Sequence, residues 1–344
     1  MSWFNTEGAC PERILYSKAR FWRNAARMPF GASADAKKIA DLYAKIDKLL
    51  LGNGFRAEKL QSCAAIACHA LAEKQIVDAS ISMGDGARTV YINEPCNLSV
   101  SLGGRDLISI QSVMSGRAVT EAKNSAAVAE QMLDGEITFA YSERIGYLCQ
   151  NPELCGSCFE LSAALFLPSL RLLGIFDEVR RQLLSRGAVL SPMFHHRELA
   201  GDLYVLSYVP PYLVCEESAT LHFDAIVGEL AAREEKNERM LFPDAEDKLS
   251  DCAMRAMGIL KYATKMSESE MLCLLSDVRL AASLCSDRSI PLPSMTDLNF
   301  LSVEGLSCSL MSGSAQKCAT AEELDAARAA FLKKYISAKV KTAV

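Results

Sequence analysis

The sequence predicts an α+β protein in which an antiparallel sheet flanked by helices is followed by a smaller helical C-terminal domain. Three short β-like runs are joined by turn-forming segments of four residues each; the runs are 89–93, 98–102 and 107–114. Connections this short join antiparallel strands. From Glu217 onward the apolar residues recur at helical spacing. We therefore expect a domain boundary between residues 1–242 and 243–344.

The composition indicates a folded, soluble protein. Of the 344 residues, 50% are hydrophobic and 23% are charged, and the net charge is −5. This acidic balance argues against a nucleic-acid partner. No apolar run approaches the ~18–20 residues that span a bilayer. The N-terminal MSWFNTEGACPER also lacks a signal-peptide core. We therefore expect a cytoplasmic protein without a membrane partner.

The first half of the chain opens with an extended segment. Arg13–Asn24 alternates cationic and apolar residues, so Lys18 and Arg20 share one face of a strand and Arg23 lies off that face. Apolar spacing then predicts three helices, at about 33–51, 57–73 and 119–133. The first of these ends at a Gly-Asn-Gly sequence.

The stretch 139–168 organises the middle of the chain. A short strand is followed by a polar loop and an apolar segment that we expect to be a helix stopped by Pro168. From Cys149 to Pro168 the only charged residues are Glu153 and Glu160. Glu160 would then lie at the N-terminus of this helix, where a carboxylate is favourable.

Three cysteines in this loop stand apart from the other ten, which are scattered singly. Cys149, Cys155 and Cys158 lie within ten residues, and the last two have C-x-x-C spacing. One interpretation is a zinc or redox site. The other is that these thiols are small, buried apolar groups.

The second half of the chain is mostly helical. We expect helices at about 171–184 and 218–241 on either side of a strand at 202–208. Ser267 with Glu270, and Thr320 with Glu323, have the spacing of capping boxes that open further helices.

Several segments, in this order, resemble the ATP:guanido phosphotransferase family, and within it the bacterial protein-arginine kinases. ILYSKARFWRN resembles the early S-x-R-x-R-x-x-R-N signature, and TFAYSERIGYL resembles the segment before the active-site loop. Arg233–Met240 is similar to an E-R-x-x-R-like helix end, and LSDVRL at 275–280 is similar to a motif of the helical domain. The resemblance spans nearly the whole chain. It implies transfer of the γ-phosphoryl group of Mg·ATP to a guanidinium, and a C-terminal domain that forms dimers.

The resemblance also implies five phosphate-binding cations. Two positions keep a positive charge, as Lys18 and Arg20, whereas the other three fall on Ser109, Glu160 and Leu190. Glu160 reverses the sign of its site. A unit charge pair at about 4 Å is worth on the order of 4 kcal/mol at an effective dielectric near 20. We therefore expect binding of ATP and Mg²⁺ to be weakened or lost.

The catalytic positions of the family are substituted as well. The catalytic Glu of its N-E-E-D-H-x-R turn falls on Arg105, the reactive Cys of its loop on Asn151, and a later carboxylate on His195. An alternative register places the turn on 93–99, and both registers lack the second Glu and the Arg. Arg105 and Asp106 could also be only a solvated hairpin turn.

Two further expectations depend on the family fold. His195 and His196 would lie near the three loop cysteines, which is the arrangement that a zinc site needs. In the bacterial branch an Arg-Asp pair of the C-terminal domain recognises phosphoarginine. That pair falls on Leu324 and Asp325, so the Arg is replaced.

These observations give two hypotheses for the function. The first is a catalytically degenerate homologue, a pseudokinase, that forms a homodimer and acts as a regulatory or scaffolding protein. Its partner would be an active kinase, a zinc-finger activator or a Clp-type chaperone. The alternative is a divergent but active protein-arginine kinase that uses His195 or Asp106 as its base. A third, minor interpretation is a cysteine-centred metal or redox protein.

Overall fold

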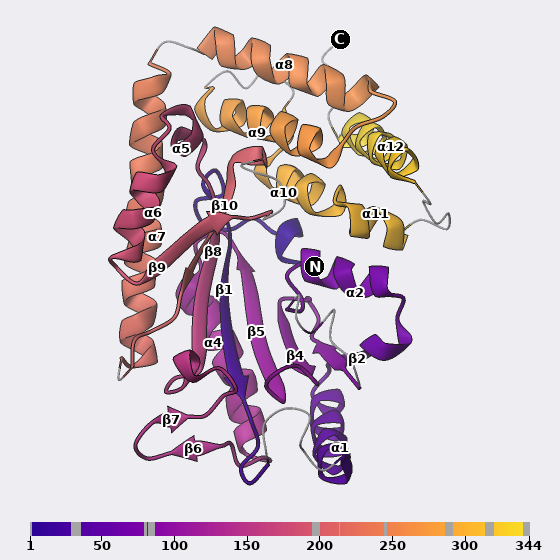
Figure 1. Ribbon diagram of the computed structural model, residues 1–344. Helices are drawn as coiled ribbons and strands as arrows, with labels where there is room; N and C mark the ends of the chain where they lie inside the picture. The colour runs from indigo at the N-terminus through magenta and orange to yellow at the C-terminus, as the bar shows by residue number, and fades with distance from the viewer. Residues whose placement is uncertain are drawn as a thin grey trace.

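The computed structural model describes residues 2–28, 36–78, 81, 87–194, 200–212, 214–243, 246–285, 292–313 and 320–339. An eight-stranded sheet, antiparallel throughout, forms its centre, with a helical part at one end (Figure 1). The expected α+β architecture is therefore confirmed. The strands in spatial order are β2 (Arg56–Lys59), β3 (Thr89–Ile92), β4 (Leu98–Leu102), β5 (Ile108–Ser115), β1 (Ile14–Arg23), β8 (Phe159–Phe166), β10 (Leu203–Tyr208) and β9 (Ala188–Pro192).

One face of the sheet is apolar and is covered by helices. Side chains that alternate along the strands, such as Phe21, Ile110 and Leu161, form the main core with these helices. The covering helices are α1 (Ala36–Gly52), α4 (Val119–Asp134), α6 (Phe176–Leu184) and α7 (Glu216–Leu241). Burial of these apolar side chains supplies the main stabilising contribution to this half of the molecule.

The helical part follows α7 and comprises α8 (Glu246–Tyr262), α9 (Glu268–Leu284), α10 (Met295–Glu304), α11 (Ser307–Gly313) and α12 (Ala321–Lys339). Ser267 caps α9 by accepting a hydrogen bond from the Glu270 amide. Thr320 and Glu323 make both bonds of the expected capping box before α12. Within the described residues, no helix combines the length and the apolar character needed to cross a membrane.

The LSDVRL motif joins the helical part to the sheet. Ser276 donates a hydrogen bond to Asp202, which also receives two bonds from Arg171 of α5 (Pro168–Leu172). Arg279 is buried, hydrogen-bonds Asn299 of α10 and lies over the ring of Phe166 in β8. The motif therefore has a structural role at the junction.

The structure corrects the prediction of a helix before Pro168. Residues 159–166 form β8, a central strand paired with β1 and β10, and Pro168 begins α5 instead of ending a helix. Seven of the eight residues of β8 are buried. A strand buried on both faces has no alternation of polar and apolar residues, so its pattern cannot be distinguished from that of a buried helix.

Other element boundaries also differ from the prediction. The expected helix at 57–73 is divided into β2, a 3-10 turn (η3, Leu60–Ser62) and α2 (Ala65–Glu73). The expected helix at 171–184 is interrupted at Gly174, which has a φ of +66°. No sequence pattern predicted β9, because this five-residue edge strand has little periodicity.

Candidate functional site on the polar face of the sheet

The face of the sheet opposite α4 and α7 carries polar side chains from several strands. Lys18 lies opposite Ser162 of β8, and Arg20 lies between Gln111 of β5 and Glu160 of β8. Directly opposed residues share a face, so these side chains form one group. The prediction that Lys18 and Arg20 lie on the same face of an extended strand is confirmed.

Arg20 is buried and has several partners within the chain. Its Nε and Nη2 atoms donate to the amide oxygen of Gln111, at 3.1 and 2.9 Å. Its Nη1 lies 2.5 Å from a carboxylate oxygen of Asp78 and 3.8 Å from one of Glu160. Glu160 therefore lies in a strand and pairs with Arg20, so the expectation that it caps a helix N-terminus is wrong.

Lys18 is held beside Arg20 by an uncharged partner. Its Nζ donates to the amide oxygen of Gln75 at 2.8 Å. Burial, with the neighbouring Arg20 as a second cause, lowers the pKa of Lys18 to about 8. With this pKa the ammonium group is still mostly protonated at neutral pH, so Lys18 remains a cation beside Arg20.

The segment after α2 lies on this polar face and is fixed by backbone contacts. Gln111 Nε2 donates to the carbonyl of Gln75 at 2.7 Å, and Ser99 Oγ donates to the carbonyl of Ile76 at 2.5 Å. Trp3 Nε1 donates to the carbonyl of Lys74 at 2.8 Å. We call residues 74–78 the covering segment, because Gln75 and Asp78 bind the two cations that the sequence had indicated for phosphate.

The cations of the polar face are bound by groups of the chain itself in this arrangement. A triphosphate needs N–H donors that are free to bind its oxygens. Each of the three nitrogen atoms of Arg20 already faces a partner, Gln111, Asp78 or Glu160. Two buried hydroxyl groups on the same face, of Tyr16 and Ser162, have no hydrogen-bond partner among the residues that the structure describes, and neither supplies positive charge.

The remaining positions expected to hold phosphate do not add cations to the face. Ser109 is on the polar face and is buried. Leu190 is buried on the opposite face, where it pairs with Leu206 in the main core. A side chain at that position points away from the polar face, so the assignment of Leu190 to the phosphate site is wrong.

Arg105 and Asp106 have different environments, although they are neighbours in the β4–β5 turn. Arg105 is exposed. Asp106 is only 6% exposed, and its Oδ1 accepts from Asn24 Nδ2 and from the Gln150 amide, both at 2.7 Å. Asp106 therefore joins the end of β1 to the loop before β8. The description of a solvated turn suits Arg105 but is wrong for Asp106.

The loop before β8 is organised by its own polar contacts. Asn151 caps a 3-10 turn (η4, Pro152–Leu154) through the Glu153 amide, and so has a local structural role. The side chain of Arg23 in β1 is fully buried and donates to the Ser157 carbonyl. Its guanidinium carbon lies 3.7 Å from the centre of the Tyr147 ring. These contacts tie the loop to the strand that carries Lys18 and Arg20.

The three loop cysteines do come together. The sulfur atoms of Cys149 and Cys155 are 4.0 Å apart, and Cys158 hydrogen-bonds Cys149, a contact that together with burial raises the pKa of the Cys149 thiol. Within the described part of the chain, no group of three or more His, Cys, Asp or Glu is placed to hold a metal ion. His195 and His196 lie outside the described residues.

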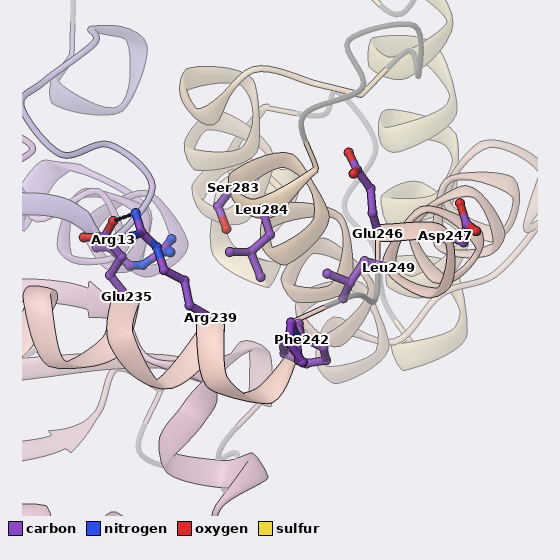
Figure 2. A pocket seen from close by; sticks show the side chains of 10 residues that line it. Arg13, Glu235, Arg239, Phe242, Glu246, Asp247, Leu249, Ser283 and Leu284 are labelled. Atoms are coloured by element: carbon purple, nitrogen blue, oxygen red, sulfur yellow. Dashed lines mark hydrogen bonds and ion pairs between the residues drawn. The ribbon is translucent and has the colours of Figure 1, made fainter.

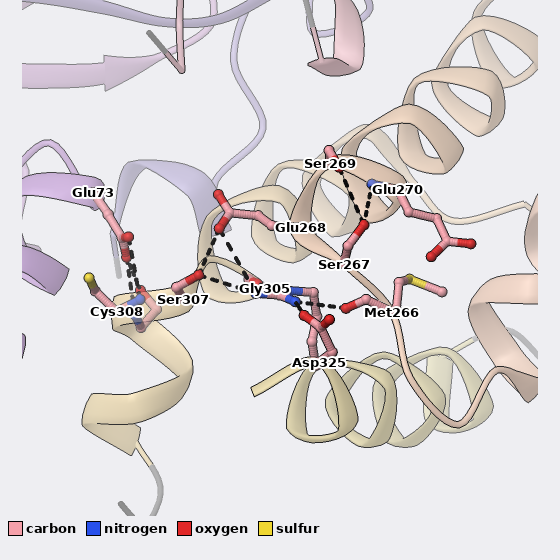
Figure 3. A network of polar contacts seen from close by, with 12 residues as sticks. Glu73, Met266, Ser267, Glu268, Ser269, Glu270, Gly305, Ser307, Cys308 and Asp325 are labelled. Carbon is pink, nitrogen blue, oxygen red and sulfur yellow. Dashed lines mark hydrogen bonds and ion pairs between the residues drawn. The ribbon is translucent and has the colours of Figure 1, made fainter. Parts of the chain in front are cut away.

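In the helical part, Asp325 does have an arginine partner, but from its own helix. Arg328 binds Asp325 Oδ1 at 2.7 Å and the Met266 carbonyl at 2.7 Å. Figure 3 shows Asp325, Met266 and Gly305 in this polar network. Arg328 is 1% exposed and also donates to the Gly305 carbonyl. This guanidinium joins α12 to the start of α9 and the end of α10.

Sequence reasoning missed Gln75, Asp78 and Gln111 as members of the site. Gln75 and Asp78 follow a helix in a segment without periodicity, and Gln111 lies in a strand whose neighbours were unknown. The left-handed backbone of Gln75, with a φ of +59°, could not be inferred from its residue type. No local signal identified these residues.

Comparison with known protein families gives two matches. Residues 39–237 match the C-terminal catalytic domain of ATP:guanido phosphotransferases. Residues 246–343 match the C-terminal domain of the protein-arginine kinase McsB.

Similar curated proteins are bacterial protein-arginine kinases. That of Pelotomaculum thermopropionicum is 24% identical over 305 residues, which is 86% of this chain and 85% of the relative. That of Symbiobacterium thermophilum is 27% identical over 290 residues, or 82% of each chain.

Similar solved structures are guanidino kinases. The duplicated taurocyamine kinase from Schistosoma mansoni, with bound components of a transition-state analogue, matches 74% of this chain with a TM-score of 0.59 and 19% identity. The match covers 38% of that longer protein. Lombricine kinase matches 67% of this chain and 68% of its own, with a TM-score of 0.56 and 16% identity. At this identity the likeness establishes the fold.

Proposed function

Because the chain belongs to the ATP:guanido phosphotransferase family and has a C-terminal domain of the protein-arginine kinase type, we propose that it is a catalytically degenerate member. In this proposal the protein has lost phosphotransfer and acts as a regulatory or scaffolding protein. It would do so as a homodimer, with an active kinase, a zinc-finger activator or a Clp-type chaperone as its partner.

The observation that carries the proposal is the set of partners of Arg20. This arginine is one of the two cations retained at the expected phosphate positions on the described polar face, and it faces two carboxylates of the chain itself. At 3.8 Å the Glu160 pair alone is worth about 4 kcal/mol before solvent screening. Glu160 is 23% exposed, so the net value is smaller. A triphosphate would still have to displace Asp78 and tolerate Glu160.

The contacts of Asp106 also favour this proposal over the active kinase. A general base must reach the proton that it removes. Asp106 is buried and its Oδ1 already accepts two hydrogen bonds. Family members use ATP with Mg²⁺, whereas on the described polar face we propose that nucleotide binding is lost.

The test is calorimetric titration with Mg·ATP, followed by incubation with labelled ATP and an arginine-rich protein. An active bacterial protein-arginine kinase serves as the positive control. We expect no binding heat up to millimolar nucleotide and no transfer of label. Phosphotransfer by the pure protein that is abolished in an Arg20→Gln variant would overturn the proposal.

A pair of variants tests whether carboxylates block the site. The double variant Asp78→Asn/Glu160→Gln removes both negative charges from Arg20, and we expect it to gain measurable affinity for Mg·ATP. Glu153→Gln is the control, because Glu153 is exposed in the loop before β8 and, within the described residues, forms no ion pair with Arg20. An equal gain in both variants would show that only net charge matters.

A further inference from the structure

Figure 2 shows a cavity of about 680 Å³ between α7, α8 and α9, lined by charges of both signs. Its two arginines already have partners in the chain, because Arg13 is ion-paired with Glu238 and Arg239 with Glu235. This cavity points to no particular ligand. The loop before β8 offers a more definite chemistry, because three thiols meet there.

The three loop thiols differ in their access to solvent. Cys149 and Cys158 are buried, whereas Cys155 is partly exposed. The sulfur of Cys149 lies 4.0 Å from that of Cys155 and is also hydrogen-bonded with Cys158. Cys149 is therefore the central thiol of the cluster, and Cys155 is the member that a small reagent in solution can reach.

The backbone of the loop brings Cys149 and Cys155 together. Asn151 caps the 3-10 turn η4 between them, and the Cys155 amide donates to the Pro152 carbonyl at 3.2 Å. The Cys155 sulfur also donates to the Cys149 carbonyl at 3.5 Å. The two sulfur atoms of a disulfide are about 2 Å apart, so the two thiols must approach by about 2 Å, which a change of side-chain rotamer can supply.

The environment of the two thiols slows their oxidation near neutral pH. Burial raises the pKa of the Cys155 thiol. The hydrogen bond with Cys158, together with burial, raises the pKa of the Cys149 thiol. The thiolate is the form that attacks an oxidant. The pair therefore reacts slowly at neutral pH and faster at higher pH.

We propose that Cys149 and Cys155 are a redox-sensitive pair, which hydrogen peroxide converts into a disulfide. The Cys155 thiolate attacks one peroxide oxygen, the O–O bond breaks and a sulfenic acid forms, while the leaving hydroxide takes up the proton that Cys155 lost. The Cys149 sulfur then attacks the sulfenic sulfur, the S–O bond breaks, and the hydroxyl group leaves with the Cys149 proton as a second water. Two electrons pass from the thiols to the peroxide. The inference does not depend on nucleotide binding.

The disulfide forms within a loop that is fixed to the end of β1 on both sides of the pair. Before Cys149, the Leu148 carbonyl accepts from Asn24 Nδ2 at 3.1 Å. After Cys155, the Ser157 carbonyl accepts from Arg23 Nη1 at 3.0 Å. A bond across η4 closes the segment between these two attachments, so oxidation changes the rigidity of the loop beside the strand that carries Lys18 and Arg20.

Peptide mass spectrometry of the intact protein tests whether the bond forms. The protein is treated with hydrogen peroxide, its free thiols are alkylated, and it is cleaved without reduction by trypsin and a glutamyl endopeptidase. Cleavage after Glu153 separates Cys149 from the other two thiols. A disulfide then appears as two linked peptides, and the alkylated third thiol identifies the partner of Cys149. We expect that partner to be Cys155. Linkage of Cys149 to Cys158 in its place would overturn the proposal.

The pair of Cys63 and Cys68 is the matched control in the same sample. It also combines a partly exposed thiol with a buried one. Its sulfur atoms, however, donate to separate carbonyls, those of Lys59 and Leu60. Because proximity accelerates the second step, we expect the bond between Cys149 and Cys155 to form at least about tenfold faster than one between Cys63 and Cys68. Equal rates would count against the proposal, and this comparison needs no variant to fold.

Hydrogen exchange tests the effect of the bond on the loop. The amides of Leu154 and Cys155 form the turn by donating to the carbonyls of Asn151 and Pro152. We expect their exchange to slow about tenfold on oxidation and to recover after reduction with dithiothreitol. Cys155→Ser should abolish both the linkage and the slowing. Cys215→Ser removes an exposed thiol before α7 and should leave both unchanged. Unaltered exchange in the oxidised protein would show that the pair is not a switch.

Discussion

Substitution of Asp106 by alanine is the sharpest test of the structural role given to this carboxylate. The change leaves two donors, the buried Asn24 Nδ2 and the part-buried Gln150 amide, without the acceptor that lies 2.7 Å from each. An unsatisfied buried donor costs about 1–3 kcal/mol. Because Asn24 Nδ2 is the buried donor of the two, we expect the free energy of unfolding to fall by about 1–3 kcal/mol. Asp106→Asn keeps an acceptor oxygen and should cost less.

The matched control is the neighbouring Arg105→Ala, which removes an exposed side chain and should change stability by no more than about 0.5 kcal/mol. Urea unfolding followed by circular dichroism gives the free energies, and hydrogen exchange at the Gln150 amide reports the local bond. If Asp106→Ala costs no more than Arg105→Ala, the carboxylate is not structural. The active-kinase alternative, with Asp106 as the base, would then regain support.

Three further predictions concern buried charges and the covering segment. Burial, opposed by Arg13, raises the pKa of Glu238 from 4.5 to about 7, so the folded state binds more protons than the unfolded state across this window. The free energy of unfolding should therefore fall as pH rises from 4.5 to 7, by up to about 3 kcal/mol. Urea titrations at several pH values should show a shallower slope in Glu238→Gln, and an identical slope would contradict this assignment. Arg328→Met removes a guanidinium with four oxygen partners in the helical part and should cost about 3–5 kcal/mol. The exposed Arg255→Met should cost about 0.5 kcal/mol in the same thermal melts, and equal costs would count against the buried network. Trp3→Phe keeps a ring but loses the bond to the Lys74 carbonyl, so it should cost about 1 kcal/mol and speed amide exchange in the covering segment; unchanged exchange there would show that Trp3 does not hold it.

The sequence predicted the elements whose signals are local. The runs that became β3, β4 and β5 are bounded by turn residues, and α1, α4 and α7 have apolar residues at helical spacing. Alternation in β1 placed Lys18 and Arg20 on a common face, because successive side chains of a strand point in opposite directions. The motifs were sufficient to indicate the family, which the comparisons confirmed.

The sequence did not indicate that strand β8 is buried on both of its faces. In β8 the alternation of polar and apolar residues is absent because both faces of the strand are covered. Its sequence is therefore compatible with a buried helix as well as with a buried strand. The sequence therefore predicted Glu160 at a helix N-terminus, whereas in the structure it lies in β8 opposite Arg20. The strand order of a sheet determines which side chains are opposed, and no local pattern encodes that order.

Tertiary structure alone decided what the retained cations do. The sequence showed that Lys18 and Arg20 keep positive charge, but residues far away in the chain supply their partners: Gln75, Asp78, Gln111 and Glu160. Likewise, the sequence allowed Asp106 to be part of an exposed turn. In the folded chain it is buried and accepts hydrogen bonds from Asn24 and Gln150. Charge is a property of a residue type, whereas its neutralisation depends on distances that only the folded chain sets.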